Sequence, residues 1–342
     1  MARYVCRMGG KGWWLVGFAV ASVLLALLGL ALGSVDLPLA DVWATLLGQG
    51  TGTDAVIVLE VRMPQVLTAA AAGAGLAAAG LLMQTVFHNP LAGPGVLGLT
   101  GGAAVGVALV MLARPIWSAA ALPQDLLVSA AAWFGALAVL MLVLLADRRV
   151  GNGATLLILG LMLSYLCTAL VSVLQAASEP GALKGFVLWG MGSFAGSTPQ
   201  RLPWLLIPVA VGLLLALALV KPMNALLVGE DHARSLGTDV GRVRRIAIWT
   251  SGLLAGSITA FCGPVAFLGL AVPHVARAFL RTADHRVLMP GTILLGVALA
   301  VACDLAVRAP WTGGALPLNA VTSLLGAPVV LWVLLGGRKW GQ

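Results

Sequence analysis

The strongest constraint in this sequence is a series of long apolar runs that contain no Asp, Glu, Lys or Arg. An α-helix needs about 20 predominantly apolar residues to cross the hydrocarbon core of a bilayer. The chain is 60% hydrophobic and 9% charged, whereas a soluble domain carries about 25% charged residues, so lipid is the expected solvent. The runs are 13–33, 63–87, 95–113, 126–146, 154–177, 202–220, 246–276, 287–303 and 315–337.

The seventh run is too long for one span and contains a signal that breaks helices. Pro264 lacks a backbone N–H and clashes with the preceding turn, and Gly263 stands directly before it. We therefore expect an all-α integral membrane protein with about ten transmembrane helices, in a single transmembrane domain over residues 1–342. The expected spans are 13–33, 63–87, 95–113, 126–146, 154–177, 202–220, 246–263, 264–280, 287–307 and 315–337.

The distribution of basic residues predicts the orientation of these spans. An even number of spans puts both termini on one side, and Lys and Arg are enriched on the cytoplasmic side. With both termini cytoplasmic, fifteen of the 20 basic residues lie inside and five lie outside. The run 13–33 exceeds the 7–15 residues of a signal-peptide core, so we expect it to be retained as the first span. These features predict a multi-pass membrane protein with both termini on the cytoplasmic side.

Composition and motif searches exclude several other classes. The net charge of +8 comes from residues in short loops between spans, which fits membrane topology and not nucleic-acid binding. The four cysteines form no CxxC pair, so we expect buried thiols and no metal site or disulfide. The GxGxxG match at 93–98 joins two spans and therefore lacks the strand–turn–helix setting of a dinucleotide site. No Walker A loop is present, so the chain is not expected to bind ATP itself.

Charged residues are absent from the centres of the expected spans. Asp304 is the one acid near a span, and Arg308 follows it by four residues, so the two can pair on one helix face. Transporters driven by ion gradients usually need an intramembrane ionisable group. An ion-coupled or facilitative secondary transporter remains the alternative, and dependence on a gradient would identify it. An integral-membrane enzyme would need a cluster of polar residues at one depth, which the sequence does not show.

Glycine is abundant, with 43 residues, and several lie at the spacing of close helix contacts. Gly98, Gly102 and Gly106 repeat every four residues on the third expected helix, and Gly252 and Gly256 do so on the seventh. Small residues allow helix backbones to approach closely in lipid. The pattern predicts a tightly packed bundle.

The segment 221–245 is the longest stretch on the predicted cytoplasmic side. Residues 225–227 and 233–236 read as two short helices separated by a turn at Gly229. Glu230 and Asp231 stand at the start of the second helix, where the helix dipole favours anions, and Gly237 stands at its end as a C′ residue. Two short helices outside the membrane would form a firm docking surface.

Several segments resemble, in order, the motifs of the FecCD/BtuC-type (type II) ABC importer permeases, and the resemblance covers about residues 13–336. Two positions differ from the family pattern: Gln65 stands where relatives often have Arg, and His88 where Arg usually precedes the NPLA sequence. The matching segments are Arg62-Met63-Pro64, Gln84, Asn89-Pro90-Leu91-Ala92, Leu97-Gly98, Trp189 to Ser193, Gly229 to Gly237, Gly263 to Leu270, Pro273 to Arg277, Leu316-Pro317 and Gly326-Ala327-Pro328.

The resemblance implies a BtuC-like permease bundle that works as a homodimer in the membrane lipid, without bound nucleic acid. Two separate ATP-binding-cassette ATPase subunits would dock from the cytoplasm and hold ATP and Mg²⁺, so the chain itself would bind no cofactor or metal and would not be an enzyme. The resemblance also implies a place in the bacterial inner membrane, where a periplasmic or lipid-anchored binding protein would deliver the substrate. Arg62 and Arg308 would face outward and meet glutamates on the two lobes of that binding protein. The residues that the resemblance assigns to ATPase coupling are Gly229, Glu230, Ala233, Arg234, Leu236 and Gly237, and those that it assigns to structure are Asn89, Pro90, Gly263, Pro264, Pro273, His274 and Arg277.

The resemblance also implies a pore lined mainly by the helix expected at 154–177. Met162 and Tyr165 on this helix are candidates for substrate contact. The implied cargo is an iron chelate (siderophore or haem) or cobalamin, moved into the cytoplasm by alternating access. His274 invites a haem-ligand reading, but its motif is shared by relatives with different substrates, so a structural role is expected. The residues of the implied cytoplasmic gate are Gly151, Asn152, Gly153, Ala154 and Thr155.

Overall fold

The computed structural model describes residues 2–33, 35, 37–113, 123–150, 153–308 and 316–336, and the side chains of these except 2–11, 334 and 336. Every regular element within these ranges is a helix. The chain forms two compact units, and each is built from segments that are distant in sequence. The first unit comprises Met1–Ala78, Ser193–Ile207 and Ala266–Gln342, and the second comprises Ala79–Gly192 and Pro208–Val265.

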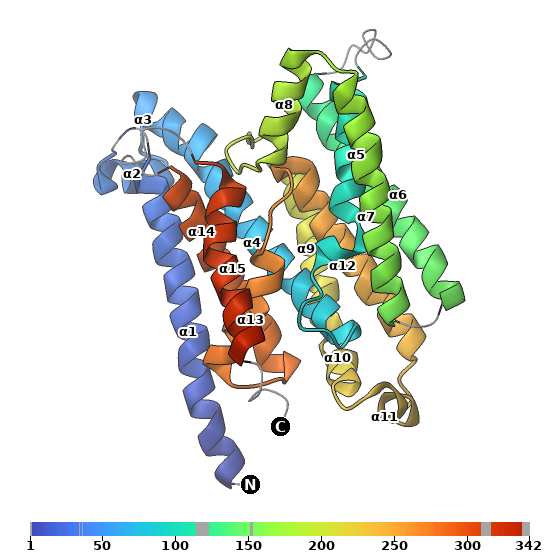
Figure 1. The fold of residues 1–342 in the computed structure, drawn as a ribbon. Helices are drawn as coiled ribbons and strands as arrows, with labels where there is room; N and C mark the ends of the chain where they lie inside the picture. Colours follow the sequence, from blue (N-terminus) through green and yellow to red (C-terminus); the bar gives the residue numbers. More distant parts are fainter. Residues whose placement is uncertain are drawn as a thin grey trace. The chain divides into compact units, whose positions relative to one another are not determined.

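The first unit holds both ends of the chain, and the second holds most of its middle (Figure 1). Helices α4 (Met63–Val86) and α9 (Leu202–Ala218) each have residues in both units. The first unit also contains α1 (Ala2–Ala31), α2 (Leu39–Leu46), α3 (Gly52–Val56), the π-helical segment η1 (Ile57–Arg62), α13 (Leu268–Leu280), α14 (His285–Val307) and α15 (Leu318–Gly336). The second also contains the 3₁₀ turn η2 (Pro94–Leu97), α5 (Leu99–Met111), α6 (Gln124–Val150), α7 (Gly153–Ala176), α8 (Pro180–Gly190), α10 (Val220–Leu226), α11 (Glu230–Ser235) and α12 (Val240–Cys262).

Each of the ten expected spans coincides with a helix or with a pair of helices. Within the described residues, six helical stretches are long and apolar enough to cross a membrane by themselves. A seventh candidate is the pair α9 and α10, which is bent by 51° at a short break. The other three expected spans coincide with the shorter apolar stretches Leu99–Met111, Leu268–Leu280 and Leu318–Val333. The all-helical membrane class is therefore confirmed, while the count of ten crossings and their limits stay predictions.

Helices α1, α4 and α14 pack together in the first unit. The Ser22 hydroxyl on α1 donates a hydrogen bond to the Leu294 carbonyl oxygen on α14 at 2.9 Å. Gly73 on α4 and Gly296 on α14 face one another so closely that a Cβ on either would overlap the other's carbonyl oxygen. Backbone contact at paired glycines is the arrangement that small residues permit in lipid.

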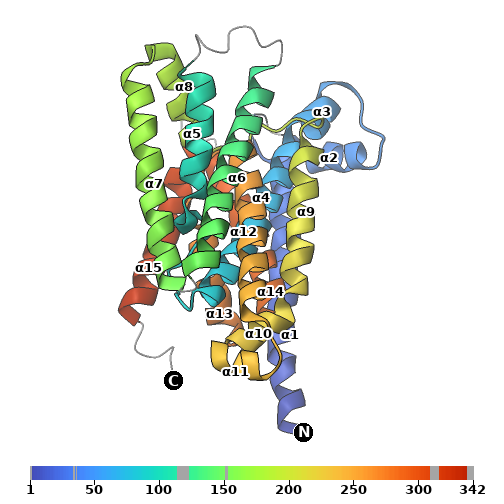
Figure 2. The same ribbon diagram turned by 90° about the vertical axis from the view of Figure 1, so that its right-hand side faces the viewer.

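Helices α5 and α6 make the corresponding backbone contact in the second unit. A Cβ added to Gly102 or to Gly135 would overlap the carbonyl oxygen of the other glycine, and one added to Gly106 would overlap the Ala131 carbonyl. The expected tight contact through Gly102 and Gly106 is thus confirmed. Gly98 differs from the expectation, because it precedes α5 as its N-cap residue with φ of 82° and does not form part of the helix. Figure 2 shows α5, α6 and α7 adjacent within this unit.

The predicted break at Gly263 is present between α12 and α13. Helix α12 ends at Cys262, and Gly263 has φ of 70°, a left-handed value that glycine adopts at little cost. A Cβ at this position would also overlap the carbonyl oxygen of Trp189, the first residue of the family motif Trp189 to Ser193. Helices α2, α3 and α8 lie between the expected spans and are not among the elements that the sequence predicts.

Substituting Gly102 by alanine tests the contact between α5 and α6. We expect Gly102→Ala to destabilise the protein by about 1–3 kcal/mol, because the new methyl group forces the two backbones apart. Gly17→Ala is the matched control, since Gly17 lies in α1 with no atom within 4 Å of a built Cβ. Thermal unfolding of the purified protein in detergent measures both variants. Equal unfolding temperatures for the two variants would contradict the close contact.

Candidate functional site

The segment expected to dock an ATPase forms the two short helices α10 and α11, as predicted. Gly229 lies between them as the N-cap of α11, with φ of 114°, a conformation that side chains rarely adopt. Glu230 and Asp231 occupy the first turn of α11, where the expected favourable interaction with the helix dipole applies. Figure 2 shows α10 and α11 at one end of the second unit, beside the start of α12.

Gly237 ends α11 as the C′ residue that the sequence predicts. Its φ is 82°, and its N–H donates to the Arg234 carbonyl oxygen at 2.9 Å. The next N–H, of Thr238, donates to the Ala233 carbonyl oxygen at 2.9 Å. Together these two bonds form a Schellman motif, which satisfies carbonyls that a helix end would leave without partners.

A buried arginine ties α11 to the bundle. Arg244 on α12 donates to Glu230 at 2.7 Å and lies 3.7 Å from Asp147 on α6. The side chains of Arg244 and Asp147 are each only 7% exposed. Glu230 also accepts from Arg234 at 3.2 Å on the surface of α11. The one guanidinium therefore links α6, α11 and α12.

The remaining side chains of α11 divide between an inner and an outer face. Ala233 is fully buried and packs against the rest of the unit, which explains the need for a small residue there. Leu236, by contrast, is 75% exposed, and Leu227 and Val228 in the preceding turn are also exposed. Large exposed apolar residues on a short, well-capped helix form a surface suited to binding another protein.

The loop after α4 contacts the same region. The Nε2 atom of His88 lies 3.0 Å from the Leu226 carbonyl oxygen at the end of α10. The Asn89 side chain accepts from the Leu91 N–H at 2.9 Å, which closes a turn through Pro90. The structural role that the resemblance implies for Asn89 and Pro90 stays a prediction, and this turn is consistent with it. His88, which differs from the family pattern, connects their loop to the end of α10.

The two arginines expected to dock a binding protein donate hydrogen bonds to carbonyl oxygens at the C-terminal end of α1. Arg62 is 3% exposed, and its Nη1 donates to the carbonyl oxygens of Leu30 and Ala31 at 2.8 and 2.6 Å. Arg308 donates to the Gly29 carbonyl oxygen at 3.2 Å. The expectation that Arg62 faces outward is therefore corrected: its guanidinium is held inside the first unit.

Asp304 and Arg308 form the ion pair that their spacing predicts, at 2.7 Å on one face of α14. Asp304 is 1% exposed, and its second oxygen accepts from Nε2 of Gln65 at 2.8 Å. Gln65 therefore has a defined function at the position where relatives often have Arg. With this neutral donor, both oxygens of the Asp304 carboxylate have a hydrogen-bond partner. No third cation is added beside Arg62 and Arg308.

Helix α7 exposes most of its surface within the described residues. Buried residues form a single stripe through Leu156, Gly160, Cys167 and Val171. Met162 and Tyr165 lie away from this stripe and are 51% and 61% exposed. The sequence Gly153–Ala176 contains no charged residue, so this exposed surface is apolar with Tyr and Thr hydroxyl groups.

The expected gate residues fall at the N-terminal end of α7. Gly153 is its first residue, and Ala154 and Thr155 in its first turn are exposed. Gly151 and Asn152 lie outside the described residues. A Cβ on Gly153 would lie 3.2 Å from the Phe87 ring, so the start of α7 approaches the end of α4 closely.

Pro273, His274 and Arg277 lie on α13 in the first unit. Pro273 and His274 are buried, and Arg277 is partly buried, as befits residues that pack the helix. Within the described residues, no group of three His, Cys, Asp or Glu side chains could hold a metal ion. Pro264 lies in the non-helical link before α13, directly after Gly263.

Arg244 and Asp147 were not predicted as site residues. Asp147 stands in the run Asp147-Arg148-Arg149 and Arg244 in the run Arg242-Val243-Arg244-Arg245, which look like ordinary cytoplasmic charge clusters. The available signal is that Asp147 and Arg244 each lie within one helical turn of the end of a long apolar run. An unpaired charge at such a position is costly.

Comparisons with known proteins find similarity over nearly the whole chain. It matches the model of the FecCD transport family over residues 21–336. It is 34% identical over 330 residues to the vitamin B12 import system permease protein BtuC of Shigella boydii, covering 95% of this chain and 96% of the relative. The protein of the same name from Klebsiella pneumoniae is 33% identical over 329 residues, covering 96% and 95%. The chain also matches a solved structure, in an inward-facing conformation, of an ABC transporter proposed to be of the metal-chelate type. The TM-score is 0.82 and the sequence identity is 29%, and the match covers 94% of this chain and 98% of that chain.

The fold and these likenesses define a multi-pass membrane protein, the non-catalytic transmembrane component of an ABC importer. The chain belongs to the FecCD transport family, as its motifs indicated. This membership decides for the ABC importer among the transporter classes that the sequence left open. It also excludes the integral-membrane enzyme.

Removing the buried guanidinium tests the contact of Arg244 with α6 and α11. We expect Arg244→Met to destabilise the protein by about 3 kcal/mol, because Asp147 is left buried without its partner. Arg242→Met is the control, since Arg242 is 75% exposed and its ion pair with Asp239 is long, at 3.9 Å. A surface pair of that kind contributes about 0–1 kcal/mol. Thermal unfolding in detergent compares the two variants, and a smaller loss for Arg244→Met than for Arg242→Met would refute the assigned role.

Proposed function

We propose that this permease carries a large metal chelate, either an iron chelate (siderophore or haem) or cobalamin, from the periplasm into the cytoplasm. The observation that carries the proposal is the likeness over nearly the whole chain to vitamin B12 permeases and to a transporter proposed to carry metal chelates. The uncharged exposed surface of α7 supports it. A large cargo passes most readily along a wall without charged groups that would hold it in place.

The partners follow from the same proposal. Two copies of the chain form the pore, with α7 of each lining it and Met162 and Tyr165 in reach of the cargo. Two ATPase subunits bind ATP and Mg²⁺, so the chain itself needs no cofactor. A periplasmic or lipid-anchored binding protein supplies the cargo from outside and provides most of the selectivity.

In this proposal, movement of the ATPase subunits is transmitted to the permease through α10 and α11. In this proposal, the ATPase grips the exposed side of α11 at Leu236 and the adjoining turn at Val228. Arg244 passes the movement to α6 and α12 through its contacts with Glu230 and Asp147. His88 passes it to the loop between α4 and α5. Tilting of these helices opens the pore alternately to each side.

The docking role of the outer arginines takes a modified form. Arg308 is 14% exposed at its side chain and can meet an acidic residue of the binding protein while it keeps Asp304. Arg62 contributes by holding the end of α1 in place, because its donors are already used by carbonyl oxygens. In this proposal, the binding protein meets a surface at the C-terminal end of α1, whose carbonyl oxygens are held by Arg62 and Arg308.

Uptake by reconstituted vesicles tests the proposed cargo and energy source together. We expect vesicles that hold the permease, its ATPase and its binding protein to take up cobalamin, haem or a ferric siderophore only when ATP is present. Leu236→Glu should reduce uptake at least tenfold, because a charged group at the centre of an apolar contact prevents the ATPase from docking. Co-purification of the ATPase with the permease gives an independent measure of docking.

Leu47→Glu is the control for that substitution, because Leu47 is 70% exposed and lies in a segment predicted to face the periplasm. It should leave co-purification of the ATPase unchanged. Uptake of none of the three chelate classes, or uptake driven by an ion gradient without ATPase, would overturn the proposed function. Undiminished co-purification with Leu236→Glu would overturn the docking surface alone.

A further inference from the structure

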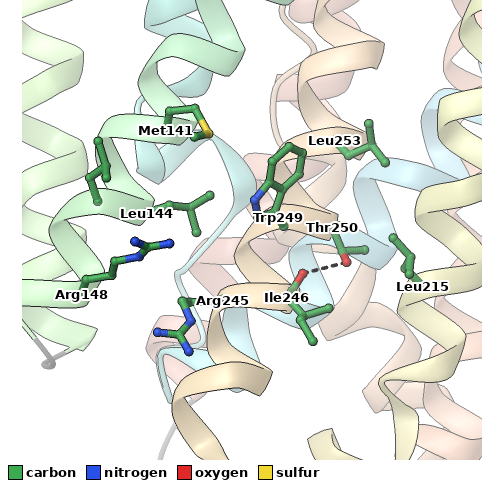
Figure 3. A pocket seen from close by; sticks show the side chains of 10 residues that line it. Met141, Leu144, Arg148, Leu215, Arg245, Ile246, Trp249, Thr250 and Leu253 are labelled. Atoms are coloured by element: carbon green, nitrogen blue, oxygen red, sulfur yellow. Dashed lines mark hydrogen bonds between the residues drawn. The ribbon is translucent and has the colours of Figure 1, made fainter.

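An open groove lies between α6, α9 and α12 of the second unit and has no place in the proposed transport cycle. Its volume is about 430 Å³, and it is lined mainly by apolar side chains. Figure 3 shows Met141 and Leu144 from α6 on one side, Leu215 from α9 on the other, and Trp249 from α12 between them. Met141, Leu215 and Trp249 are all substantially exposed.

Two arginines border one end of this groove. Arg148 reaches it from the last turns of α6, and Arg245 reaches it from the first turns of α12 (Figure 3). Both are exposed, and within the described part of the chain neither forms an ion pair. The nearby acids Asp147 and Glu230 are engaged by Arg244. The groove therefore has an apolar floor and an uncompensated double positive charge at one end.

The depth of these groups matches the polar boundary of a membrane. Arg148 stands just beyond the end of the expected span 126–146, and Arg245 just before the start of the expected span 246–263. Trp249 follows Arg245 by one helical turn, at the level where an indole ring with an apolar body and a polar N–H is favoured. The apolar lining continues from there along α6 and α12 toward the hydrocarbon core.

We propose that this groove binds one anionic phospholipid of the inner leaflet, on the orientation predicted from the basic residues. The phosphate lies between Arg148 and Arg245, and an acyl chain follows the floor past Trp249. Basic pockets between transmembrane helices at the cytoplasmic face bind anionic lipid headgroups through this combination of charge and apolar contact. An acidic segment of a protein partner would match the arginines but would leave two turns of apolar floor unused.

Native mass spectrometry of the full chain in detergent tests the proposal by titration with phosphatidylglycerol or phosphatidylcholine of the same acyl chains. We expect phosphatidylglycerol to bind the wild type at lower concentration than phosphatidylcholine. Each arginine should contribute about fivefold in affinity near an anionic headgroup. The double variant Arg148→Gln/Arg245→Gln should therefore lose about 25-fold in affinity for phosphatidylglycerol, and that affinity should approach the affinity for phosphatidylcholine.

The double variant Arg149→Gln/Arg242→Gln is the matched control. It removes the same charge from the same two helices, but neither residue lines the groove. It should keep the wild-type preference for phosphatidylglycerol, and millimolar inorganic phosphate should not displace the lipid. Equal binding of the two lipids by the wild type, or equal losses in both double variants, would overturn the site. Loss of ATPase co-purification in Arg148→Gln/Arg245→Gln without a change in lipid affinity would reassign the arginines to a protein contact.

Discussion

The proposed coupling of ATPase to pore depends on one interaction, the guanidinium of Arg244 between Glu230 and Asp147. A single ion pair on a surface would be too weak to carry force, since such pairs contribute about 0–1 kcal/mol. Here the arginine and Asp147 are each 7% exposed, so separating them leaves a charge without water or partner. That cost holds α6 and α12 together at this point, and Glu230 joins α11 to the same guanidinium at 2.7 Å. Leu236 is 75% exposed, as the proposed contact with the ATPase requires.

A second set of arginine contacts satisfies backbone carbonyl groups in the first unit, at the C-terminal end of α1. The last four carbonyl oxygens of a helix have no partner within it. In α1 each has a donor: Leu28 from the Leu32 N–H, Gly29 from Arg308, and Leu30 and Ala31 from Arg62. Cations at this position also interact favourably with the helix dipole. The arginines that the family resemblance assigns to docking are thus structural first, and only Arg308 keeps a partly exposed side chain.

The parts of the fold that could be predicted are those fixed by local sequence. A long apolar run must form a helix in lipid because each backbone group needs an internal partner, and Gly263 with Pro264 cannot continue one. Gly237 likewise ends α11 through its own conformation. The partner choices could not be predicted. Arg244 and Arg245 are adjacent and chemically identical, yet the 100° turn between them directs one to Asp147 and the other to the groove beside Trp249. Only the packing of α6 against α12 decides which is buried.

A distance measurement between α11 and α6 tests the rigid link most directly. Spin labels at Asp231→Cys, whose native side chain is 96% exposed, and at Arg149→Cys would report this distance in the assembled transporter, with Cys6 replaced by serine. Pulsed electron paramagnetic resonance with and without bound nucleotide should give one narrow distribution at the same distance in both states. Arg244→Met should broaden it. A distance that shifts or broadens on nucleotide binding in the chain with native Arg244 would contradict the account, because α11 would then move independently of the bundle.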